Sequence, residues 1–414
     1  MSKQQLQKTL EIVEKQNTWR EKECINLIAS ENIMSPQAIE VFNSDMMHRY
    51  AEGLPYKRHY QGTKYVDEIE TLVIDLGKKL FHCKHFDPRP ISGMIANLCV
   101  YVALTEPGDK IANLNIHDGG HISHSTVGTA GVRGLKTLNM PFDPQEMNID
   151  VDKLKPLLKN EEIKLVILGG SLFLFPHPVK EIKEVLLGDT KILYDASHVL
   201  GLIAGKRFQD PLREGADVVA SSSHKTFPGP QGGMVYTDND KMSKQVAQAI
   251  LPGLISNHHL FRLPSLAITL IEMLEFGEKY ADQTVKNSKK LASSLYEMGF
   301  NVLCEHKGFT ESHQVVVDVR ENKGGKTVAE TLERANIICN KNLLPWDKDE
   351  NTEDPSGIRL GTQECTRTGM KESEMEHIAN LINRVIIKGE KPEKVREEVI
   401  QFKKEYSETK YCFT

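Results

Sequence analysis

Lys225 is the residue whose surroundings most favour chemistry, and it lies in the segment Ser221–Gly233, SSSHKTFPGPQGG. The apolar run Ala216–Ala220 before it predicts a buried strand, whereas the Pro- and Gly-rich stretch after it belongs to neither a helix nor a central strand. A lysine on a rigid turn between buried strands is costly to bury while charged, so we expect its pKa to be lowered, as Schiff-base chemistry requires. Most lysines are simply solvated, so this hypothesis depends on the neighbouring residues.

Short apolar runs alternate with helical patterns through the first two thirds of the chain. The strand-like runs are Lys110–Ile116, Lys136–Met140, Lys164–Leu168, Lys191–Tyr194, Val218–Ala220 and Met234–Tyr236, and helical patterns cover Asp152–Leu158 and Val179–Leu187. This alternation predicts an α/β fold with a mainly parallel sheet covered by helices. Ligands of such folds bind at the carboxyl ends of the strands.

Polar residues follow two of these runs. His121 lies in the stretch HDGGHISH after the first run, and Asp195 and His198 directly follow Tyr194. All three, with Lys225, would therefore face one crevice, although a lone Asp at a strand end is usually a helix cap. A His/Asp metal site is the rival explanation. No HExxH-type or His-x-His spacing occurs on a predicted helix, so we expect no metal.

Three further segments suggest binding. Ser92-Gly93 precedes the apolar helix Ile95–Leu104, where free backbone N–H groups commonly hold phosphate. The aperiodic stretch Tyr50–Tyr65 predicts a loop, which is either a binding surface or an exposed connection packed by tyrosines. Arg359 lies in a strand-like run, and a buried arginine needs a carboxylate or phosphate partner, for which a structural glutamate is the alternative to a ligand.

The alternation stops after about residue 265. The pattern Leu266–Phe300 predicts a long helix, broken only at Gly277, that bridges two domains. Beyond it we expect strands at His313–Val319 and Ile337–Cys339, with a helix at Thr327–Ala335. The predicted domains are residues 1–275, a helical arm with the large domain, and residues 276–414, a smaller α+β domain.

Composition excludes several classes of protein. The 414 residues are 39% hydrophobic and 26% charged with a net charge of −5, which fits a soluble globular protein and argues against nucleic acid as the main partner. No apolar run has the length of a membrane span, and the N-terminus lacks a signal-peptide core. Seven cysteines lie far apart without a Cys-x-x-Cys pair, which predicts reduced thiols in a cytoplasmic protein.

The chain resembles the serine hydroxymethyltransferase family along nearly its whole length. The motifs that carry the resemblance are Leu27–Asn32 (LIASEN), Tyr50–Gly53 (YAEG), Lys57-Arg58 with Tyr60, Tyr65–Glu68 (YVDE), Ser92-Gly93, Gly119–His121, Asp195 with His198, His224–Thr226 and Ser356–Thr362 (SGIRLGT). SNHH, NKNLLPW and GTQECTR resemble the archaeal branch. The resemblance implies a pyridoxal 5'-phosphate enzyme of the aspartate-aminotransferase-like fold, acting as a homodimer with a shared active site.

The resemblance also implies roles around the cofactor. Lys225 would form its Schiff base, and Asp195 would hold the pyridine nitrogen protonated, which makes the ring an electron sink. His121 would stack on the ring and His198 would lie near its hydroxyl. The residues that would surround the phosphate are Ser92, Gly93, Ser222 and His224.

On the substrate side, Arg359 would bind the serine carboxylate in a bidentate pair, assisted by Ser30. Glu52 would move the hydroxyl proton as a general acid/base, and Asn342 and Glu52 are candidates for contact with the pterin. Tyr50 and Tyr60 would complete the site from the partner subunit, with Tyr50 among the residues that bind the cofactor. The implied reaction, serine–glycine interconversion in one-carbon metabolism, reversibly transfers the hydroxymethyl carbon of serine to a reduced pterin and leaves glycine.

The sequence departs from the family pattern at a few positions. Ser256-Asn257 stands where Gly-Gly is usual, Met94 replaces a common Ser, and Gln231 replaces an Arg. Most departures lie around the phosphate and the pterin, so tetrahydrofolate and tetrahydromethanopterin are both candidate carriers. The alternative functions are a pyridoxal-phosphate aldolase that cleaves 3-hydroxy amino acids such as threonine or allo-threonine without a pterin, and a non-enzymatic cofactor-binding protein.

Overall fold

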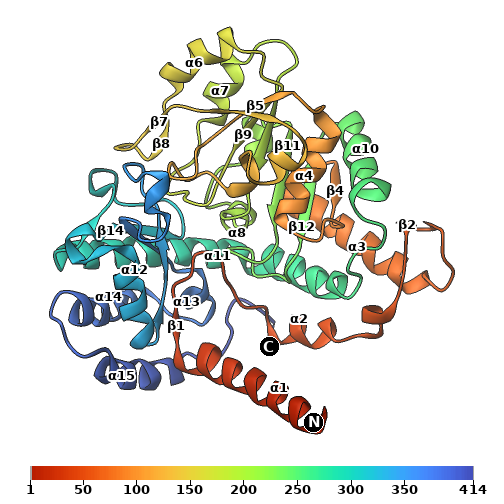
Figure 1. Cartoon of the computed structure of the whole chain (residues 1–414). Helices are drawn as coiled ribbons and strands as arrows, with labels where there is room; N and C mark the ends of the chain where they lie inside the picture. Colours follow the sequence, from red (N-terminus) through yellow and green to blue (C-terminus); the bar gives the residue numbers. More distant parts are fainter. Residues whose placement is uncertain (1, 414) are drawn as a thin grey trace. The chain divides into compact units, whose positions relative to one another are not determined.

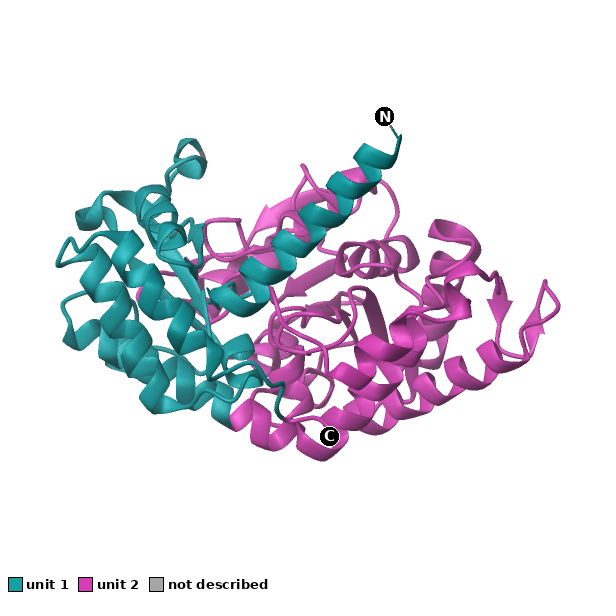
Figure 2. Ribbon diagram, turned by 90° about the horizontal axis from the view of Figure 1, so that it is seen from below, with its two compact units in different colours: residues 1–29, 283–410 teal, residues 30–282, 411–414 magenta. Residues whose placement is uncertain are grey.

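The computed structural model describes residues 2–413 and consists of two compact units. Unit 1 comprises residues 1–29 and 283–410, and unit 2 comprises residues 30–282 and 411–414 (Figure 2). The division predicted from the sequence lies instead at residues 275/276. The first 29 residues group with the C-terminal part because strand β1 (Ile25–Asn26) pairs in parallel with β15 (Ile337–Ile338).

Unit 2 is built on a seven-stranded sheet. Its strands, in spatial order, are β4 (His85–Asp87), β12 (Gly233–Thr237), β11 (Val218–Ser222), β10 (Lys191–Asp195), β9 (Leu165–Leu168), β5 (Lys110–Asn113) and β6 (Lys136–Asn139). All neighbouring pairs from β11 to β6 are parallel, and only β12 runs antiparallel to its neighbours. The predicted, mainly parallel sheet is therefore confirmed.

Unit 2 also contains helices, several of which cover the sheet. They are α2 (Pro36–Phe42), α3 (Lys64–Phe81), α4 (Gly93–Leu104), α5 (Thr129–Val132), α6 (Val151–Asn160), α7 (Val179–Val185), α8 (Leu200–Ala204), α9 (Pro211–Glu214) and α10 (Asp240–Gln248). Helix α4 packs against β11 and β12, and α10 packs against α4 (Figure 1). The central strands are buried along their whole length, which is the continuous apolar pattern expected when both faces of a parallel sheet are covered.

Two predictions about elements of unit 2 need correction. The strand predicted at Lys110–Ile116 ends at Asn113, since the next residues turn back on themselves with the Gly120 N–H donating to the Asn115 carbonyl. The predicted loop Tyr50–Tyr65 contains a short hairpin of β2 (Gly53–Leu54) and β3 (Lys57–Arg58). Strands of two residues leave no readable alternation in the sequence. A second hairpin joins β7 (Phe142–Asp143) and β8 (Asn148–Ile149).

Unit 1 contains a four-stranded antiparallel sheet. Its order is β13 (Asn301–Val302), β14 (Gln314–Asp318), β17 (Gly357–Gly361) and β16 (Asn340–Asn342). Its helices are α1 (Ser2–Asn17), α12 (Gly324–Arg334), α13 (Gln363–Arg367), α14 (Glu372–Ile386) and α15 (Pro392–Lys404). Helix α11 (Arg262–Glu297) is continuous through Gly277, and the division between the units falls within it at residues 282/283.

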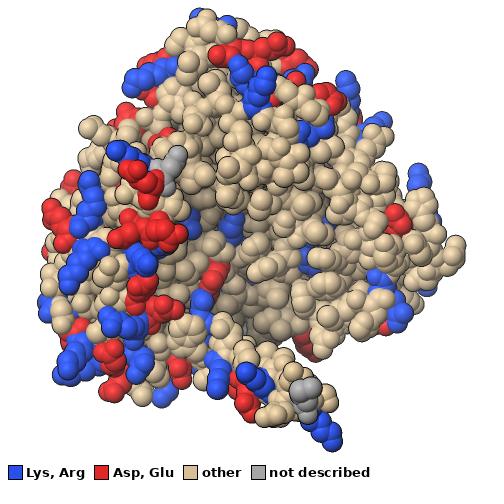
Figure 3. Space-filling view, viewed as in Figure 1, with Lys and Arg blue, Asp and Glu red and all other residues tan. Residues whose placement is uncertain are grey.

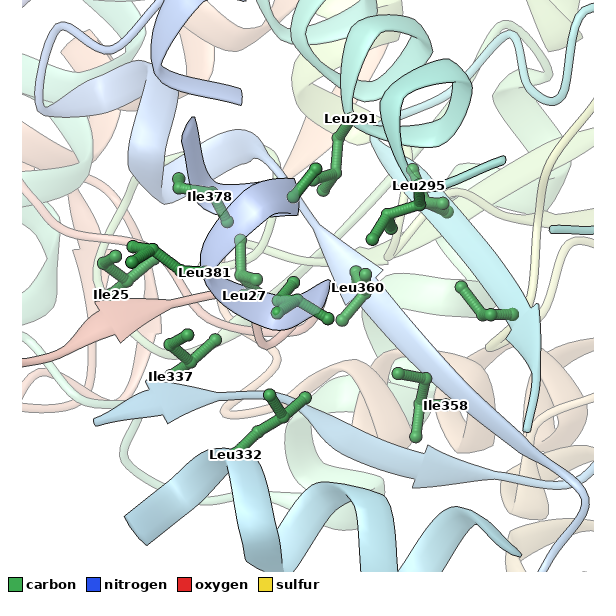
Figure 4. Close-up of a cluster of buried hydrophobic side chains, with 14 of the residues drawn as sticks. Ile25, Leu27, Leu291, Leu295, Leu332, Ile337, Ile358, Leu360, Ile378 and Leu381 are labelled. Atoms are coloured by element: carbon green, nitrogen blue, oxygen red, sulfur yellow. The ribbon is translucent and has the colours of Figure 1, made fainter. Parts of the chain in front are cut away.

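The core of unit 1 explains why the N-terminal segment belongs to it. Ile25 and Leu27 are fully buried and lie among side chains from distant parts of the chain (Figure 4). The neighbours labelled there are Leu291, Leu295, Leu332, Ile337, Ile358, Leu360, Ile378 and Leu381. Burying a Leu or Ile side chain contributes about 1.5–3 kcal/mol, so this segment is a substantial part of the unit's stability.

The surface carries charges of both signs. On the face shown in Figure 3, basic and acidic residues are interspersed and form no continuous basic surface. Among the described residues, none of the helices combines the length and the apolarity needed to span a bilayer.

Candidate active site

A cavity of about 200 Å³ opens in unit 2 at the carboxyl ends of the parallel strands. Its lining residues come from the start of α4, from the last residues of β10 and β11, and from the segments that follow β5, β9, β10 and β11. They are Ser92, Gly93, Met94, Asn97, His121, Gly170, Asp195, Ser197, His198, Ser222, His224 and Lys225. The cavity thus brings together every residue that the resemblance assigned to the cofactor except Tyr50.

Lys225 is half-buried on the irregular turn after β11. Asn32 holds this turn, because its Nδ2 donates to the Lys225 carbonyl at 2.7 Å and lies 2.8 Å from the Tyr280 hydroxyl. Thr226 adds a second anchor, since its hydroxyl donates to the His198 carbonyl at 2.7 Å. The backbone of the lysine is therefore fixed on two sides, and its side chain reaches the cavity wall from a defined position.

Asp195 is buried at the end of β10 and is clamped by three donors. Its Oδ2 lies 2.7 Å from Asn97 Nδ2 and 3.1 Å from His124 Nε2, and its Oδ1 accepts the Ser197 N–H at 3.0 Å. Both oxygens therefore have fixed positions. One oriented carboxylate on the wall of the cavity is suited to bind a protonated ring nitrogen.

Electrostatics keep the Asp195 carboxyl ionised. Burial by itself raises its pKa, but the hydrogen bond from His124 and the charges of His124, His121 and Lys225 bring the pKa well below the usual range of an aspartate. A carboxyl group of such low pKa is a carboxylate at neutral pH, so its negative charge stabilises a positively charged group beside it.

The other end of the cavity carries neutral donors. Ser92 caps α4, with its Oγ accepting the Ile95 N–H at 3.2 Å, so the predicted start of a helix at this point is confirmed. Two buried polar atoms of the wall, Ser222 Oγ and His224 Nδ1, lack a hydrogen-bond partner within the described part of the chain. Burial, with the nearby charges of Lys225 and Arg262, lowers the pKa of His224 to about 4 and keeps its imidazole neutral. This set of donors fits the phosphate of the expected cofactor.

A fully buried arginine stands behind this end of the cavity. The guanidinium of Arg262 donates to the carbonyls of Pro88, Pro90 and Gly233 at 2.7, 2.8 and 2.8 Å. Gly232 makes room for it, because a Cβ there would lie 2.3 Å from Arg262 Cζ. Burial lowers the pKa of Arg262 to about 10, so the group is still a cation at neutral pH. It joins the segment before α4 to the strand after the lysine turn.

Four predicted residues of unit 2 do not line the cavity. Ser30 is half-buried in a turn, and Glu52 is half-buried just before β2. Tyr50 and Tyr60 are 43% and 45% exposed, with their ring centroids 4.9 Å apart.

Arg359 and Asn342 belong to unit 1. Arg359 is buried in β17, where its Nε donates to Asn340 Oδ1 at 3.2 Å, and burial lowers its pKa to about 10. Asn342 is half-buried in β16 and donates to the Leu343 carbonyl at 2.6 Å. The predicted strand around Arg359 is therefore confirmed, and its contact with substrate stays a prediction.

The residues that position Asp195 and Lys225 by hydrogen bonds were missed in the sequence analysis. Asn97 lies one helical turn beyond Gly93 and so faces the same side of α4, which is a signal that the sequence does contain. His124 closes the stretch HISH after His121 and is fully buried. Asn32 ends the LIASEN motif. Within residues 2–413, no group of three or more His, Cys, Asp or Glu side chains is arranged to hold a metal ion.

Comparisons with known proteins agree on one family. A family model described as serine hydroxymethyltransferase matches residues 3–382. The serine hydroxymethyltransferase of Methanocaldococcus jannaschii is 57% identical over 404 residues, which cover 96% of this chain and 94% of that protein. The same-named protein of Methanopyrus kandleri is 53% identical over 402 residues, 97% of this chain and 94% of the relative.

A solved structure shares the fold. The crystal structure of L-threonine transaldolase from Pseudomonas fluorescens in its internal aldimine state matches with a TM-score of 0.90 and 30% sequence identity. The match covers 100% of this chain and 96% of that one.

Proposed function

Because the chain belongs to the serine hydroxymethyltransferase family, we propose that it reversibly transfers the hydroxymethyl carbon of serine to a reduced pterin and leaves glycine. The family confirms the enzyme class predicted from the sequence, a transferase that depends on pyridoxal phosphate. It also favours the transferase over the pterin-independent aldolase. The observation that carries the proposal is the cavity in which Lys225, Asp195 and the neutral donors meet.

Pyridoxal phosphate, when bound, supplies an electron sink that stabilises negative charge developing at the substrate carbon. Lys225 would hold it covalently, and Ser92, Gly93, Ser222 and His224 would bind its phosphate. Two neutral, buried and otherwise unpartnered side-chain atoms at that end of the cavity support this assignment. His121 would cover the ring, and His198 would lie near its hydroxyl.

Asp195 would keep a proton on the ring nitrogen. Its carboxylate is ionised because His124, His121 and Lys225 lower its pKa, and Asn97 and His124 fix its orientation. A proton between this carboxylate and a ring nitrogen stays on the nitrogen, since the carboxylate is a very weak base.

The residues outside the cavity would serve the substrate. Arg359, a buried guanidinium, would bind the serine carboxylate through two parallel hydrogen bonds, assisted by Ser30. Glu52 would take the proton of the serine hydroxyl and return it in the reverse reaction. Asn342 would contact the pterin, for which tetrahydrofolate and tetrahydromethanopterin are the candidates.

A homodimer with a shared site would complete this arrangement in the cytoplasm. Tyr50 and Tyr60 expose large parts of their rings, as expected of residues that a second subunit covers. Helix α1 supports the same proposal. Leu6 and Leu10 lie four positions apart, on one face of this helix, and are 61% and 57% exposed, so the face is apolar and available to a second subunit.

Pterin dependence tests the proposal directly. Purified protein loaded with pyridoxal phosphate should release glycine from serine much faster with a reduced pterin than without one, and comparison of the two pterins identifies the carrier. Lys225→Ala protein is the control for uncatalysed condensation of formaldehyde with pterin. Cleavage of allo-threonine together with indifference of serine cleavage to both pterins would establish the aldolase instead.

A further inference from the structure

Asn257 holds the segment that carries Glu52. It lies in the loop between the π-helical turn Ala249–Leu254 and α11. Its Oδ1 accepts the N–H of Ala51 at 3.0 Å, and its Nδ2 donates to the carbonyl of Arg49 at 3.2 Å. One side chain thus binds a donor and an acceptor of a segment about 200 residues away, and these two contacts fix the orientation of its amide.

The neighbours of Asn257 contact the same region. Ser256 Oγ and the Tyr50 hydroxyl are hydrogen-bonded at 3.0 Å. His258 Nε2 lies 3.1 Å from Glu70 Oε2, and both side chains are almost fully buried. Three consecutive side chains therefore bind residues 49–51 and Glu70 of α3, and we call these three residues the 256–258 clamp.

Arg58 connects the clamp to the backbone on both sides of Glu52. Its guanidinium forms ion pairs with Glu70 at 2.6 Å and with Asp67 at 2.7 Å, and its side chain is 2% exposed. Its Nη1 also donates to the carbonyls of Ala51 and Gly53, at 2.8 and 2.6 Å. Glu70 is thus shared between His258 of the clamp and the arginine that binds the flanking carbonyls.

Further contacts hold the backbone at Glu52 and Gly53. The Glu52 carbonyl accepts the His59 N–H at 2.9 Å. Gly53 has a φ of +109°, and a Cβ there would lie 2.6 Å from the Lys57 carbonyl oxygen, so the hairpin geometry requires glycine. These contacts hold the backbone on both sides of Glu52, and the Glu52 side chain itself is half-buried.

We infer that the 256–258 clamp, and Asn257 above all, is a positioning element that sets where the Glu52 carboxyl stands during proton transfer. This inference rests on the proposed function of Glu52. A general base must stand within hydrogen-bond reach of its proton, and a displacement of about 1 Å can cost on the order of 100-fold in rate. Loss of Asn257 frees the Ala51 N–H, which is the backbone donor next to Glu52.

Asn257→Ala removes both hydrogen bonds, and Asn148→Ala is its matched control. Asn148 also makes one bond of each kind to the backbone, with Oδ1 accepting from Ile149 and Nδ2 donating to Pro176, each at 2.9 Å, in the β7–β8 region. In the holoenzyme, Asn257→Ala should lower kcat for pterin-dependent serine cleavage about 10- to 100-fold, with KM for serine within about threefold of the parent value. The control should stay within about threefold in both constants.

Amide hydrogen exchange of the holoenzyme measures the protection of the Ala51 N–H independently of catalytic activity. In the Asn257→Ala protein, the Ala51 amide hydrogen should exchange at least about tenfold faster than in the parent. In the Asn148→Ala protein, its exchange rate should be unchanged. Asn257→Asp keeps the acceptor for this amide and loses the donor to Arg49, so its exchange and its kcat should be intermediate. This variant serves if Asn257→Ala does not fold.

A double substitution separates positioning from general damage. In a Glu52→Gln background, Asn257→Ala should cost less than about threefold further, because the group that it positions is already inactive. An undiminished loss in that background, or an unchanged Ala51 exchange rate, overturns the inference. If Glu52→Gln itself cleaves serine with pterin at the parent rate, the proposed role of Glu52 fails and the inference falls with it. If Glu52→Gln is impaired and Asn257→Ala is not, the inference alone fails.

Discussion

Arg262→Met should destabilise the protein by about 2–6 kcal/mol. The arginine donates three hydrogen bonds to carbonyls, each worth about 1.5–3 kcal/mol for a charged donor, so about 5–9 kcal/mol in total. Against this stands the cost of burying the charge. The fall of its pKa from 12.5 to about 10 corresponds to about 3 kcal/mol. Methionine fills a similar volume without the charge, so the difference should appear as lost stability.

Urea unfolding of the holoenzyme measures this loss, as a lower midpoint at an unchanged slope. Arg207→Met is the control, because Arg207 pairs with Asp282 at 3.2 Å while both side chains are more than 40% exposed. Such surface pairs contribute about 0–1 kcal/mol. Titration of the apoprotein with pyridoxal phosphate should also show weaker binding for Arg262→Met, because the segment before α4 loses its anchor.

A loss below about 1 kcal/mol for Arg262→Met, similar to that of Arg207→Met, would refute this reasoning. It would mean that the burial cost of the guanidinium cancels its three hydrogen bonds. If stability is reduced but cofactor affinity is unchanged, Arg262 stabilises the fold without contributing to the binding of the phosphate.

The other predictions concern the site and its pH dependence. Lys225→Ala should carry no covalent cofactor after borohydride reduction, as read by peptide mass spectrometry; labelling of one other native lysine would contradict this. Asp195→Asn should fold normally and lose activity by on the order of 10²–10³, whereas near-parent turnover would assign the ring nitrogen to another group. Arg359→Lys should raise KM for serine roughly 10- to 100-fold with unchanged cofactor affinity, and an effect on cofactor affinity alone would move the arginine to the phosphate. Burial lowers the pKa of His177 from 6.5 to about 3. As the pH falls below 6.5, this histidine is therefore protonated in the unfolded chain but not in the folded one, and the free energy of unfolding decreases, by about 2 kcal/mol at pH 5. His177→Asn should lack that part of the acid loss in urea titrations at pH 7 and 5, and an identical loss would exclude His177 as its cause.

The sequence predicted the side chains that follow strands better than it predicted their supports. Asp195, His121 and Lys225 could be placed in one crevice because the carboxyl ends of parallel strands meet at one edge of a sheet. Asn97 and His124 could not, since they meet Asp195 across 98 and 71 positions of the chain. Such contacts leave no local pattern.

The same reason explains the elements that were predicted and those that were missed. The strands β9, β10 and β11 carry short but uninterrupted apolar runs because the sheet is covered on both faces. The two-residue strand β1 carries no such run, whereas β15 lies within the strand predicted at Ile337–Cys339. Their pairing, which assigns the first 29 residues to unit 1, is visible only in three dimensions.

This pairing has a consequence for synthesis on the ribosome. All of residues 30–282, the contiguous part of unit 2, are made before the strand that β1 needs. Ile25 pairs with Ile337, so at about 5–20 residues per second the N-terminal segment waits roughly 15–60 s for its partner strand. During that time Ile25 and Leu27, which are fully buried in the finished protein, have no core to enter. The nascent chain therefore exposes an apolar segment although residues 30–282 of the larger unit have already been made, and that interval is when a chaperone would be needed.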